Sequence, residues 1–351
     1  MSRSVLYAEV PGFYAQVERA ARPDLVGRPI VVGGDPRKAG LVQAVSPEAE
    51  VAGVHPGMSM LDALGLCPAA RPLITDMRRY REAGVHLCAC LRRASEWIEE
   101  AALGAAYAET PEGGDPEALG QAWRESVAAE LGLPLRVGIA PVKFAARLAA
   151  QEAGPSEIRR VLASELESFL RPLPVGRLDG VGANTEAELA KHEVRTVGEL
   201  AALGSRVEEL LGNRGLELLA LAQGRDTSPV CATRHPKTLS LELTLSSEQV
   251  DTGVLSERLQ ELAEALERRL SLEGLVARRV ALKLRYADGR TVSRRTTLGS
   301  AIAESAEIHA AGLALLRRTQ AGARPVRLVG LALTELDVAE RDDRQLELFP
   351  R

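Results

Sequence analysis

Three glutamates adjoin apolar segments of this 351-residue chain, where carboxylates could bind a divalent metal ion. Glu9 ends the apolar run 4–9, and Glu99 and Glu100 stand side by side just before the run 101–107. Carboxylates that meet at strand ends are suited to hold two Mg²⁺ ions about 3.5–4 Å apart, the arrangement that assists phosphoryl transfer. These glutamates are the right chemical type to bind such ions; the alternative is three unrelated surface carboxylates near strand ends.

The elements that must position these carboxylates follow an α/β pattern, with helices packed against a sheet. A helix is predicted at 13–21, and strands are predicted at 4–9, 29–33, near 101–107 and 135–140. The region 12–72 is punctuated by glycine and proline and is predicted to form a small separate lobe.

The strand signal stops after about residue 166, and short amphipathic helices are predicted at 185–191 and 196–202. The turn that precedes them contains Gly180, Val181 and Gly182. A Gly-Val-Gly turn between helices is typical of a helix-hairpin-helix, whose glycines let backbone N–H groups approach a phosphate closely. A tight helical turn without a ligand is the alternative.

A second strand-and-helix pattern begins at about residue 237. It predicts a strand at 239–245, a helix at 254–272, a hairpin of 280–286 and 291–297, a helix at 304–318 and a strand at 326–333. This β-α-β-β-α-β order is that of a ferredoxin-like unit.

Positive charge gathers on the predicted hairpin, although the whole chain has a formal net charge of −4. Side chains alternate along a strand, so Arg279, Lys283 and Arg285 share the face opposite the leucines. We predict that this face contacts DNA phosphates, because a merely solvated face usually mixes signs. Such binding depends strongly on salt and little on base sequence. The residues predicted to contact DNA here are Arg278, Arg279, Lys283, Arg285, Arg294 and Arg295.

Composition argues against a membrane protein and a disulfide-rich protein. The content of 46% hydrophobic and 26% charged residues is typical of a soluble globular protein. No apolar run approaches the ~20 residues of a membrane span, and no secretory signal is recognisable, so a cytoplasmic protein without a membrane partner is predicted. The four cysteines lack paired CxxC spacing, which favours free thiols over a zinc site.

Several segments resemble Y-family translesion DNA polymerases. Residues 7–18, 97–103 and 138–149 resemble the palm, 52–58 resemble the fingers, and 282–288 resemble the C-terminal domain. The resemblance spans about residues 3–350 and implies a right-hand polymerase of α/β and α+β domains. The implied parts are a palm (1–11 and 73–165), fingers (12–72), a helix-hairpin-helix thumb (166–232), a ferredoxin-like little finger (237–336) and a flexible tail (337–351).

The sequence departs from this family at the positions that bind metal ions and the incoming nucleotide. The resemblance implies a metal-binding acidic triad at Glu9, Glu99 and Glu100; the family has aspartate at the first two positions, whereas Glu100 matches. Two side chains that are one methylene longer displace metal ligands by roughly 1 Å, an error that costs on the order of a hundredfold in rate.

The positions that contact the triphosphate differ from the family even more. Pro47, Glu50 and Gly154 stand where the family has a tyrosine, an arginine and a lysine that touch the incoming triphosphate. Their loss removes roughly 5–9 kcal/mol of nucleotide binding. Phe13 and Tyr14 keep the aromatic pair whose second member resembles the ribose-excluding gate, and Lys143 keeps a cation on the palm helix, although packing alone could also keep them.

The last residues resemble the peptide that binds the bacterial sliding clamp. The peptide residues are Gln345, Leu346, Leu348 and Phe349. A flexible charged tail lets a short apolar peptide reach a pocket on a partner. A tail that packs on its own domain is the alternative.

The leading hypothesis is a catalytically impaired polymerase-like protein, similar to the ImuB type, that binds DNA and the clamp and assists another polymerase or a recombinase. No long C-terminal extension like that of this type is expected after the clamp peptide. The second hypothesis is a slow, error-prone translesion polymerase that uses Mg²⁺ at Glu9, Glu99 and Glu100. The third is a helix-hairpin-helix repair protein that performs no nucleotide chemistry and needs no cofactor.

Overall fold

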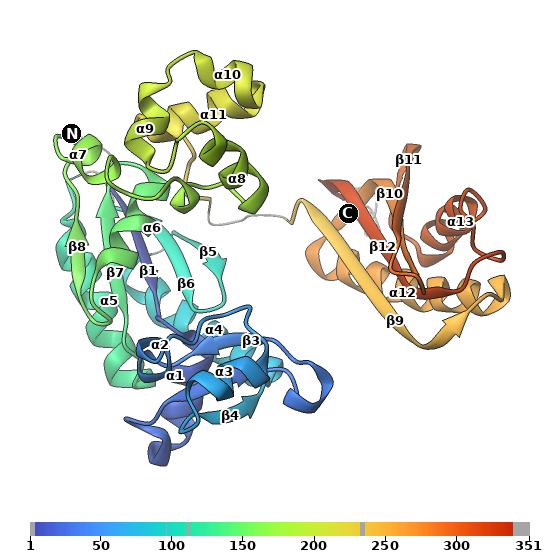
Figure 1. Ribbon diagram of the computed structural model, residues 1–351, viewed down its shortest axis with the longest axis horizontal. Helices are drawn as coiled ribbons and strands as arrows, with labels where there is room; N and C mark the ends of the chain where they lie inside the picture. The colour runs from blue at the N-terminus through green and yellow to red at the C-terminus, as the bar shows by residue number, and fades with distance from the viewer. Residues whose placement is uncertain (1–3, 96, 111–112, 232–235, 340–351) are drawn as a thin grey trace, which may run out of the picture. The chain divides into compact units, whose positions relative to one another are not determined.

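The computed structural model describes residues 4–95, 97–110, 113–231 and 236–339. Its chain divides into two compact units, Met1–Thr233 and Arg234–Arg351 (Figure 1). The first unit contains a five-stranded and a three-stranded sheet, the second unit contains a four-stranded sheet, and, among the described residues, the two units share no hydrophobic core.

The first unit is built on a five-stranded sheet with the order β5-β6-β1-β7-β8. Its strands are β1 (Val5–Glu9), β5 (Ile98–Ala102), β6 (Ala105–Glu109), β7 (Arg136–Ala140) and β8 (Ile158–Arg160). The central strand β1 is antiparallel to both β6 and β7. Leu6 and Ala8 belong to one core and Tyr7 to another, so the sheet is covered on both faces.

Helices cover the two faces of this sheet. The face that carries Leu6 packs against α4 (Met77–Ala94) and α5 (Pro116–Leu131), and the other face packs against α6 (Lys143–Glu152). A Cβ atom on Gly138 of β7 would lie only 1.9 Å from the carbonyl oxygen of Ala146. Glycine at this position therefore allows α6 to lie directly on the sheet.

The single strand expected near 101–107 is wrong, because this segment holds the end of β5, a tight turn and the start of β6. Gly104 adopts a φ of 86° in that turn. The alanines on both sides give almost no hydrophobic alternation, so the sequence shows no boundary between the two strands. Glu99 and Glu100 consequently lie inside β5 rather than before a strand.

The predicted small lobe has a three-stranded sheet of its own with the order β3-β2-β4. Its elements are α1 (Phe13–Ala21), β2 (Ile30–Gly33), β3 (Val42–Val45), α2 (Pro47–Val51), α3 (Met60–Leu66) and β4 (Arg71–Ile74), with 3-10 turns at Pro23–Leu25 and Pro36–Lys38. The strands β3 and β4 were not predicted, because exposed residues interrupt them, whereas the equally short β2 is apolar and buried throughout.

The remainder of the first unit is helical, and the described residues 166–231 contain no named strand. The helices are α7 (Leu166–Leu170), α8 (Ala183–Lys191), α9 (Val197–Ala202), α10 (Arg206–Leu211) and α11 (Asn213–Ala222), with a 3-10 turn at Val175–Arg177. Leu189 and Val197 share a core with Phe144 and Leu148 of α6. The helical part therefore packs on the α6 side of the five-stranded sheet.

The second unit confirms the predicted β-α-β-β-α-β order. Its elements are β9 (Thr238–Gln249), α12 (Thr252–Glu273), β10 (Leu275–Tyr286), β11 (Thr291–Ile302), α13 (Ser305–Leu316) and β12 (Val326–Val338). The sheet is antiparallel with the order β11-β10-β12-β9. Strand β12 continues to Val338, so the first two residues of the expected tail belong to the sheet, and residues 340–351 of that tail lie outside the described residues.

In the part of the chain that the structure describes, no helix is long and apolar enough to cross a membrane.

Candidate active site and nucleic-acid interface

The register of the five-stranded sheet separates the three predicted glutamates. Tyr107 of β6 is paired with Tyr7 on one side and with Glu99 on the other. Directly paired residues share a face of a sheet, as do residues two apart along a strand. Glu9 and Glu99 therefore lie on the same face, and Glu100 lies on the opposite face.

Glu9 is held by two neighbours. Arg136 of β7 is directly opposite Glu9 in the register and places Nη2 2.6 Å and Nε 2.8 Å from Glu9 Oε1. The Tyr7 hydroxyl donates to Glu9 Oε2 over 3.0 Å. Burial, assisted by the Glu9 carboxylate, raises the pKa of the Tyr7 phenol well above its ordinary value, so Tyr7 remains a donor. Both carboxylate oxygens of Glu9 thus accept hydrogen bonds from this chain.

Glu99 is a buried member of an ion pair. Its side chain is 2% exposed, and Lys143 Nζ lies 2.5 Å from Oε2. The same oxygen accepts the Cys231 backbone N–H over 2.8 Å. The Lys143 ammonium also lies 4.9 Å from the centre of the Tyr107 ring. The cation retained on the palm helix therefore neutralises Glu99.

These contacts also hold the chain that leaves the helical part. Lys143 Nζ donates to the Pro229 carbonyl over 3.2 Å. The Val230 N–H donates to Glu109 Oε1 over 3.1 Å, next to the Cys231 N–H bond to Glu99. We call residues 229–231 the exit segment. Its backbone is bound to the same face of the sheet as the Lys143–Glu99 pair.

Glu100 faces away from this cluster. It is 59% exposed and accepts a 2.8 Å hydrogen bond from Arg92 of α4. Among the described residues, no three side chains of His, Cys, Asp or Glu are grouped so as to hold a metal ion. The predicted triad is therefore not assembled here, and this arrangement does not fit a two-Mg²⁺ site, because Glu9 and Glu99 each pair with a cation and Glu100 lies on the other face.

A pocket of about 490 Å³ opens beside Glu9, between the start of α1, strand β3 and the β5–β6 turn. Tyr14 lines it and stacks on Tyr80, with ring centres 4.3 Å apart. Phe13 also contributes to the lining but is only 6% exposed and packs closely against Gly104. The aromatic pair is thus present, with Phe13 mainly in the core and Tyr14 in the pocket wall.

The three residues that replace the triphosphate contacts lie in different surroundings. Glu50 of α2 lines the pocket, as does Arg136, which is paired with Glu9. Pro47 is the first residue of α2. Gly154 follows α6, and its N–H donates to Glu157 over 3.0 Å. The pocket wall thus combines an acidic side chain with an arginine that already has a partner.

The Gly-Val-Gly turn begins α8. Gly180 has a φ of 88°, and Gly182 is the N-cap of the helix, with no side chain that caps it. A Cβ atom on Gly182 would meet nothing within 4 Å, so the backbone there is open to a ligand. The Arg147 guanidinium lies 2.7 Å from Asp179 and anchors the turn to α6.

The second unit presents a basic face on the side of its sheet opposite α12 and α13. Leu282, Leu284 and Tyr286 are buried as predicted, which leaves Arg279, Lys283 and Arg285 on the other side. Arg295 is paired with Ala281 in the register, so it also belongs to this face. We call these four cations the sheet-face cations: Arg279, Lys283, Arg285 and Arg295.

Arg294 does not belong to the sheet-face cations. It is paired in register with the buried Leu282, so it lies on the helix side, and it donates to the carbonyl of Arg318 over 3.2 Å. Its grouping with the basic face is wrong, because adjacent residues on a strand point to opposite sides. Arg278 is paired with Asp337 at 3.5 Å.

Two of the sheet-face cations have acidic partners. Arg279 lies 2.6 Å from Glu335, and Lys283 lies 2.7 Å from Glu242. These acids belong to β12 and β9, so the residues of the hairpin alone could not reveal them. The face therefore carries a smaller excess of positive charge than the hairpin sequence suggests.

The predicted clamp peptide, Gln345, Leu346, Leu348 and Phe349, lies outside the described residues.

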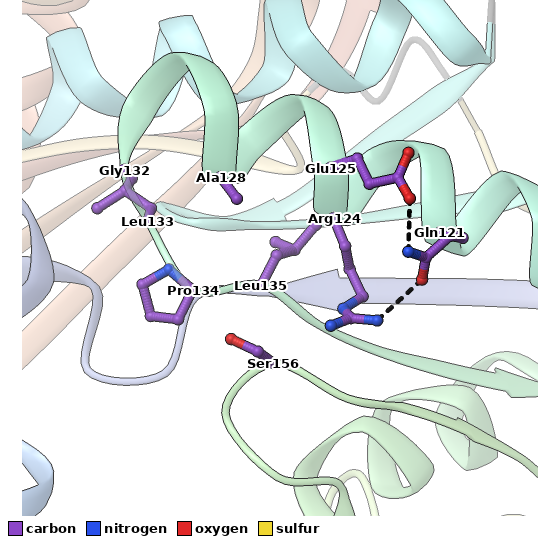
Figure 2. A pocket seen from close by; sticks show the side chains of 9 residues that line it. All are labelled: Gln121, Arg124, Glu125, Ala128, Gly132, Leu133, Pro134, Leu135 and Ser156. Carbon is purple, nitrogen blue, oxygen red and sulfur yellow. Dashed lines mark hydrogen bonds between the residues drawn. The ribbon is translucent and has the colours of Figure 1, made fainter.

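Figure 2 shows a second hollow, of about 430 Å³, between the end of α5 and the loop that contains Ser156. Its polar wall consists mainly of Gln121, Arg124 and Glu125, which hydrogen-bond to one another. None of the predicted site residues lines it.

Sequence comparisons assign both units to known families of domains. The model described as the impB/mucB/samB family matches residues 9–151, and the model of the C-terminal domain of that family matches residues 236–348. The chain is 33% identical over 353 residues to a DNA polymerase IV of Alkalilimnicola ehrlichii, with 99% of each chain covered. It is 34% identical to a DNA polymerase IV of Methanoculleus marisnigri, with 96% of this chain and 95% of that protein covered.

Solved structures confirm the predicted fold. A Y-family DNA polymerase chimera superposes with a TM-score of 0.79 at 21% identity and covers 95% of this chain and 99% of its own. DinB from Sulfolobus solfataricus superposes with a TM-score of 0.70 at 22% identity and covers 96% of this chain and 99% of its own. The chain belongs to the impB/mucB/samB family, within the Y-family DNA polymerase superfamily.

Proposed function

We propose that this chain is a DNA-binding, polymerase-like protein of DNA damage tolerance that synthesises DNA poorly, if at all, and assists another polymerase or a recombinase. One observation carries the proposal. Glu9 and Glu99 are paired with Arg136 and Lys143, while Glu100 faces the other side of the sheet. Carboxylates arranged in this way are not available as a set to hold two metal ions.

The similarity to other proteins supports DNA as the ligand. The relatives quoted above are named DNA polymerase IV. Another structure with the same fold is titled an insertion ternary complex of Dbh DNA polymerase and superposes with a TM-score of 0.74. For this chain, the sheet-face cations and the open turn at Gly182 are the surfaces that we propose contact DNA phosphates.

The pocket supports impaired nucleotide binding. Glu50 adds negative charge to a wall that would face a triphosphate, and Arg136 is already bound to Glu9. Like charges repel, and the repulsion is strongest where water is partly excluded. We therefore propose that the pocket binds nucleoside triphosphates weakly.

Primer extension tests the proposed impairment. With Mg²⁺ or Mn²⁺, primer-template DNA and all four deoxynucleotides, we expect binding of the DNA, measured by fluorescence anisotropy, and no extension of the primer. Extension that disappears in the Glu99→Ala/Glu100→Ala variant would favour a slow polymerase instead. The Lys191→Ala variant, which removes an exposed lysine of α8, serves as the control for nonspecific damage.

Deletion of residues 345–351 tests the proposed docking on the sliding clamp. We expect the truncated protein to lose association with the clamp in surface plasmon resonance, because short peptides of this kind bind through a few apolar anchors. Its affinity for DNA should stay the same, since the deletion removes none of the sheet-face cations. Clamp association that survives the deletion would contradict this assignment of the peptide.

A further inference from the structure

We infer that Arg136 and Lys143 are resident counterions, which take the place of divalent metal ions at Glu9 and Glu99. The inference deepens the proposed function, on which it rests, by naming the groups that neutralise the palm carboxylates. It follows that the palm of this protein is stable without divalent metal. It also follows that the palm gains affinity for such metal when either of these cations is removed, and most when both are.

The position of Arg136 supports the inference first. Its guanidinium approaches Glu9 Oε1 with two nitrogens, Nη2 at 2.6 Å and Nε at 2.8 Å. Both side chains are largely shielded, at 20% and 15% exposure. Mg²⁺ binds carboxylate oxygen at about 2.0–2.1 Å and demands near-octahedral geometry. A metal ion at this oxygen would have to displace the guanidinium and break two charge-assisted hydrogen bonds.

Lys143 holds the second carboxylate. Its ammonium contacts Glu99 at 2.5 Å and the Pro229 carbonyl at 3.2 Å, and it lies over the Tyr107 ring. The two side chains are 14% and 2% exposed. A buried carboxylate without a counterion destabilises the folded protein. Lys143 is therefore required for the stability of this site.

The charges explain why cations of this kind are needed. Two carboxylates on one face of a buried sheet repel each other unless positive charge is supplied. In this chain each carboxylate receives one positive charge from a side chain one strand or one helix away. Removal of both cations takes two positive charges away from the sheet face that carries Glu9 and Glu99, and the added negative charge favours a divalent ion there.

The test uses the full-length protein and Mn²⁺ alone, without DNA or nucleotide. The variants are Arg136→Gln, Lys143→Met and the two combined. Mn²⁺ binding is followed by electron paramagnetic resonance, and the melting temperature is measured in EDTA and in Mn²⁺. We expect the same melting temperature for the wild type in both solutions. We expect the double variant to bind Mn²⁺ roughly tenfold tighter or more, and to regain thermal stability with Mn²⁺.

Two controls identify the site. Addition of Glu9→Gln and Glu99→Gln to the double variant should abolish the acquired Mn²⁺ binding. The Arg92→Gln variant, which removes the partner of Glu100 on the opposite face, should bind Mn²⁺ no better than the wild type. If the double variant does not fold, the Mn²⁺ affinity of Arg136→Gln alone tests the inference. This single variant is expected to fold, because Glu9 keeps the hydrogen bond from Tyr7.

Two results would overturn the inference. One is Mn²⁺ binding by the wild type that Glu9→Gln and Glu99→Gln remove. The other is a folded Arg136→Gln or double variant with unchanged Mn²⁺ affinity. Either result, together with DNA binding and no primer extension, would leave the proposed function standing. Failure to bind DNA, with the metal results as expected, would overturn the proposed function alone.

Discussion

Replacement of Lys143 with methionine will destabilise the first unit by about 3–5 kcal/mol, the usual cost of removing one partner of a buried ion pair. Methionine retains the apolar length of the side chain but leaves Glu99, at 2% exposure, without its cation. The hydrogen bond to the Pro229 carbonyl and the cation–π contact with Tyr107 are lost at the same time. Urea unfolding in EDTA, followed by circular dichroism, measures the loss.

A matched control and a double variant make this result specific. Lys191→Met removes an exposed lysine that is paired with Glu188, and it should cost less than about 1 kcal/mol. The double variant Lys143→Met/Glu99→Gln removes both charges and should be more stable than Lys143→Met alone. A Lys143→Met protein as stable as the wild type would show that Glu99 tolerates burial without this partner.

The triple variant Arg279→Ala/Lys283→Ala/Arg285→Ala will bind primer-template DNA about 100-fold more weakly at low salt, if each cation contributes roughly 1 kcal/mol at a phosphate. The slope of log affinity against log salt concentration should become shallower by about 2.7, since each phosphate contact adds about 0.9 for duplex DNA. The loss should be similar for different DNA sequences, because phosphate contacts do not read bases. Fluorescence anisotropy at several salt concentrations measures both quantities.

The control for this variant removes three cations from the helix side of the same unit. Arg258, Arg268 and Arg269 belong to α12, which packs on the sheet face opposite the sheet-face cations. Their replacement by alanine changes the net charge equally and should leave most of the DNA affinity intact. Equal losses in the two triple variants would show that the whole charge of the unit, rather than one face of it, attracts DNA.

Within the sheet-face cations, the internal ion pairs predict a ranking. Arg279 and Lys283 must give up Glu335 and Glu242 to bind a phosphate, whereas no carboxylate among the described residues pairs with Arg285 or Arg295. The net gain on binding DNA is smaller for a cation that already has a partner. Arg285 should therefore contribute more than Lys283 to the measured affinity.

Much of the second unit could be predicted, because its strands and helices are long enough to show a period. The alternation of Leu282, Leu284 and Tyr286 identified the buried face of β10, and the structure confirms it. Arg294 was assigned to the wrong face, since it was grouped by closeness in sequence instead of by alternation. The same rule, applied to the pair Glu99 and Glu100, places them on opposite faces.

The partners of the site residues could not be predicted. Arg136, Glu242 and Glu335 each come from a strand other than that of the residue they bind. Alternation gives the face of a residue within one strand, but the register between strands depends on tertiary packing. One feature of the sequence could have singled out Arg136, because it is a charged residue in the otherwise apolar predicted strand 135–140. Only the register shows that this strand pairs with the strand of Glu9.

The exit segment contains a cysteine that can be labelled selectively to report on changes in the palm. Of the four cysteines, Cys67, Cys88 and Cys90 are buried and only Cys231 is exposed. Burial, assisted by Glu100, raises the pKa of the Cys88 thiol to about 12, which suppresses its reactivity. The backbone of Cys231 is bonded to Glu99, so a maleimide dye would attach selectively beside the Lys143–Glu99 pair. The native sequence thus permits a fluorescence readout of this pair, without any engineered cysteine, as DNA or a protein partner is added.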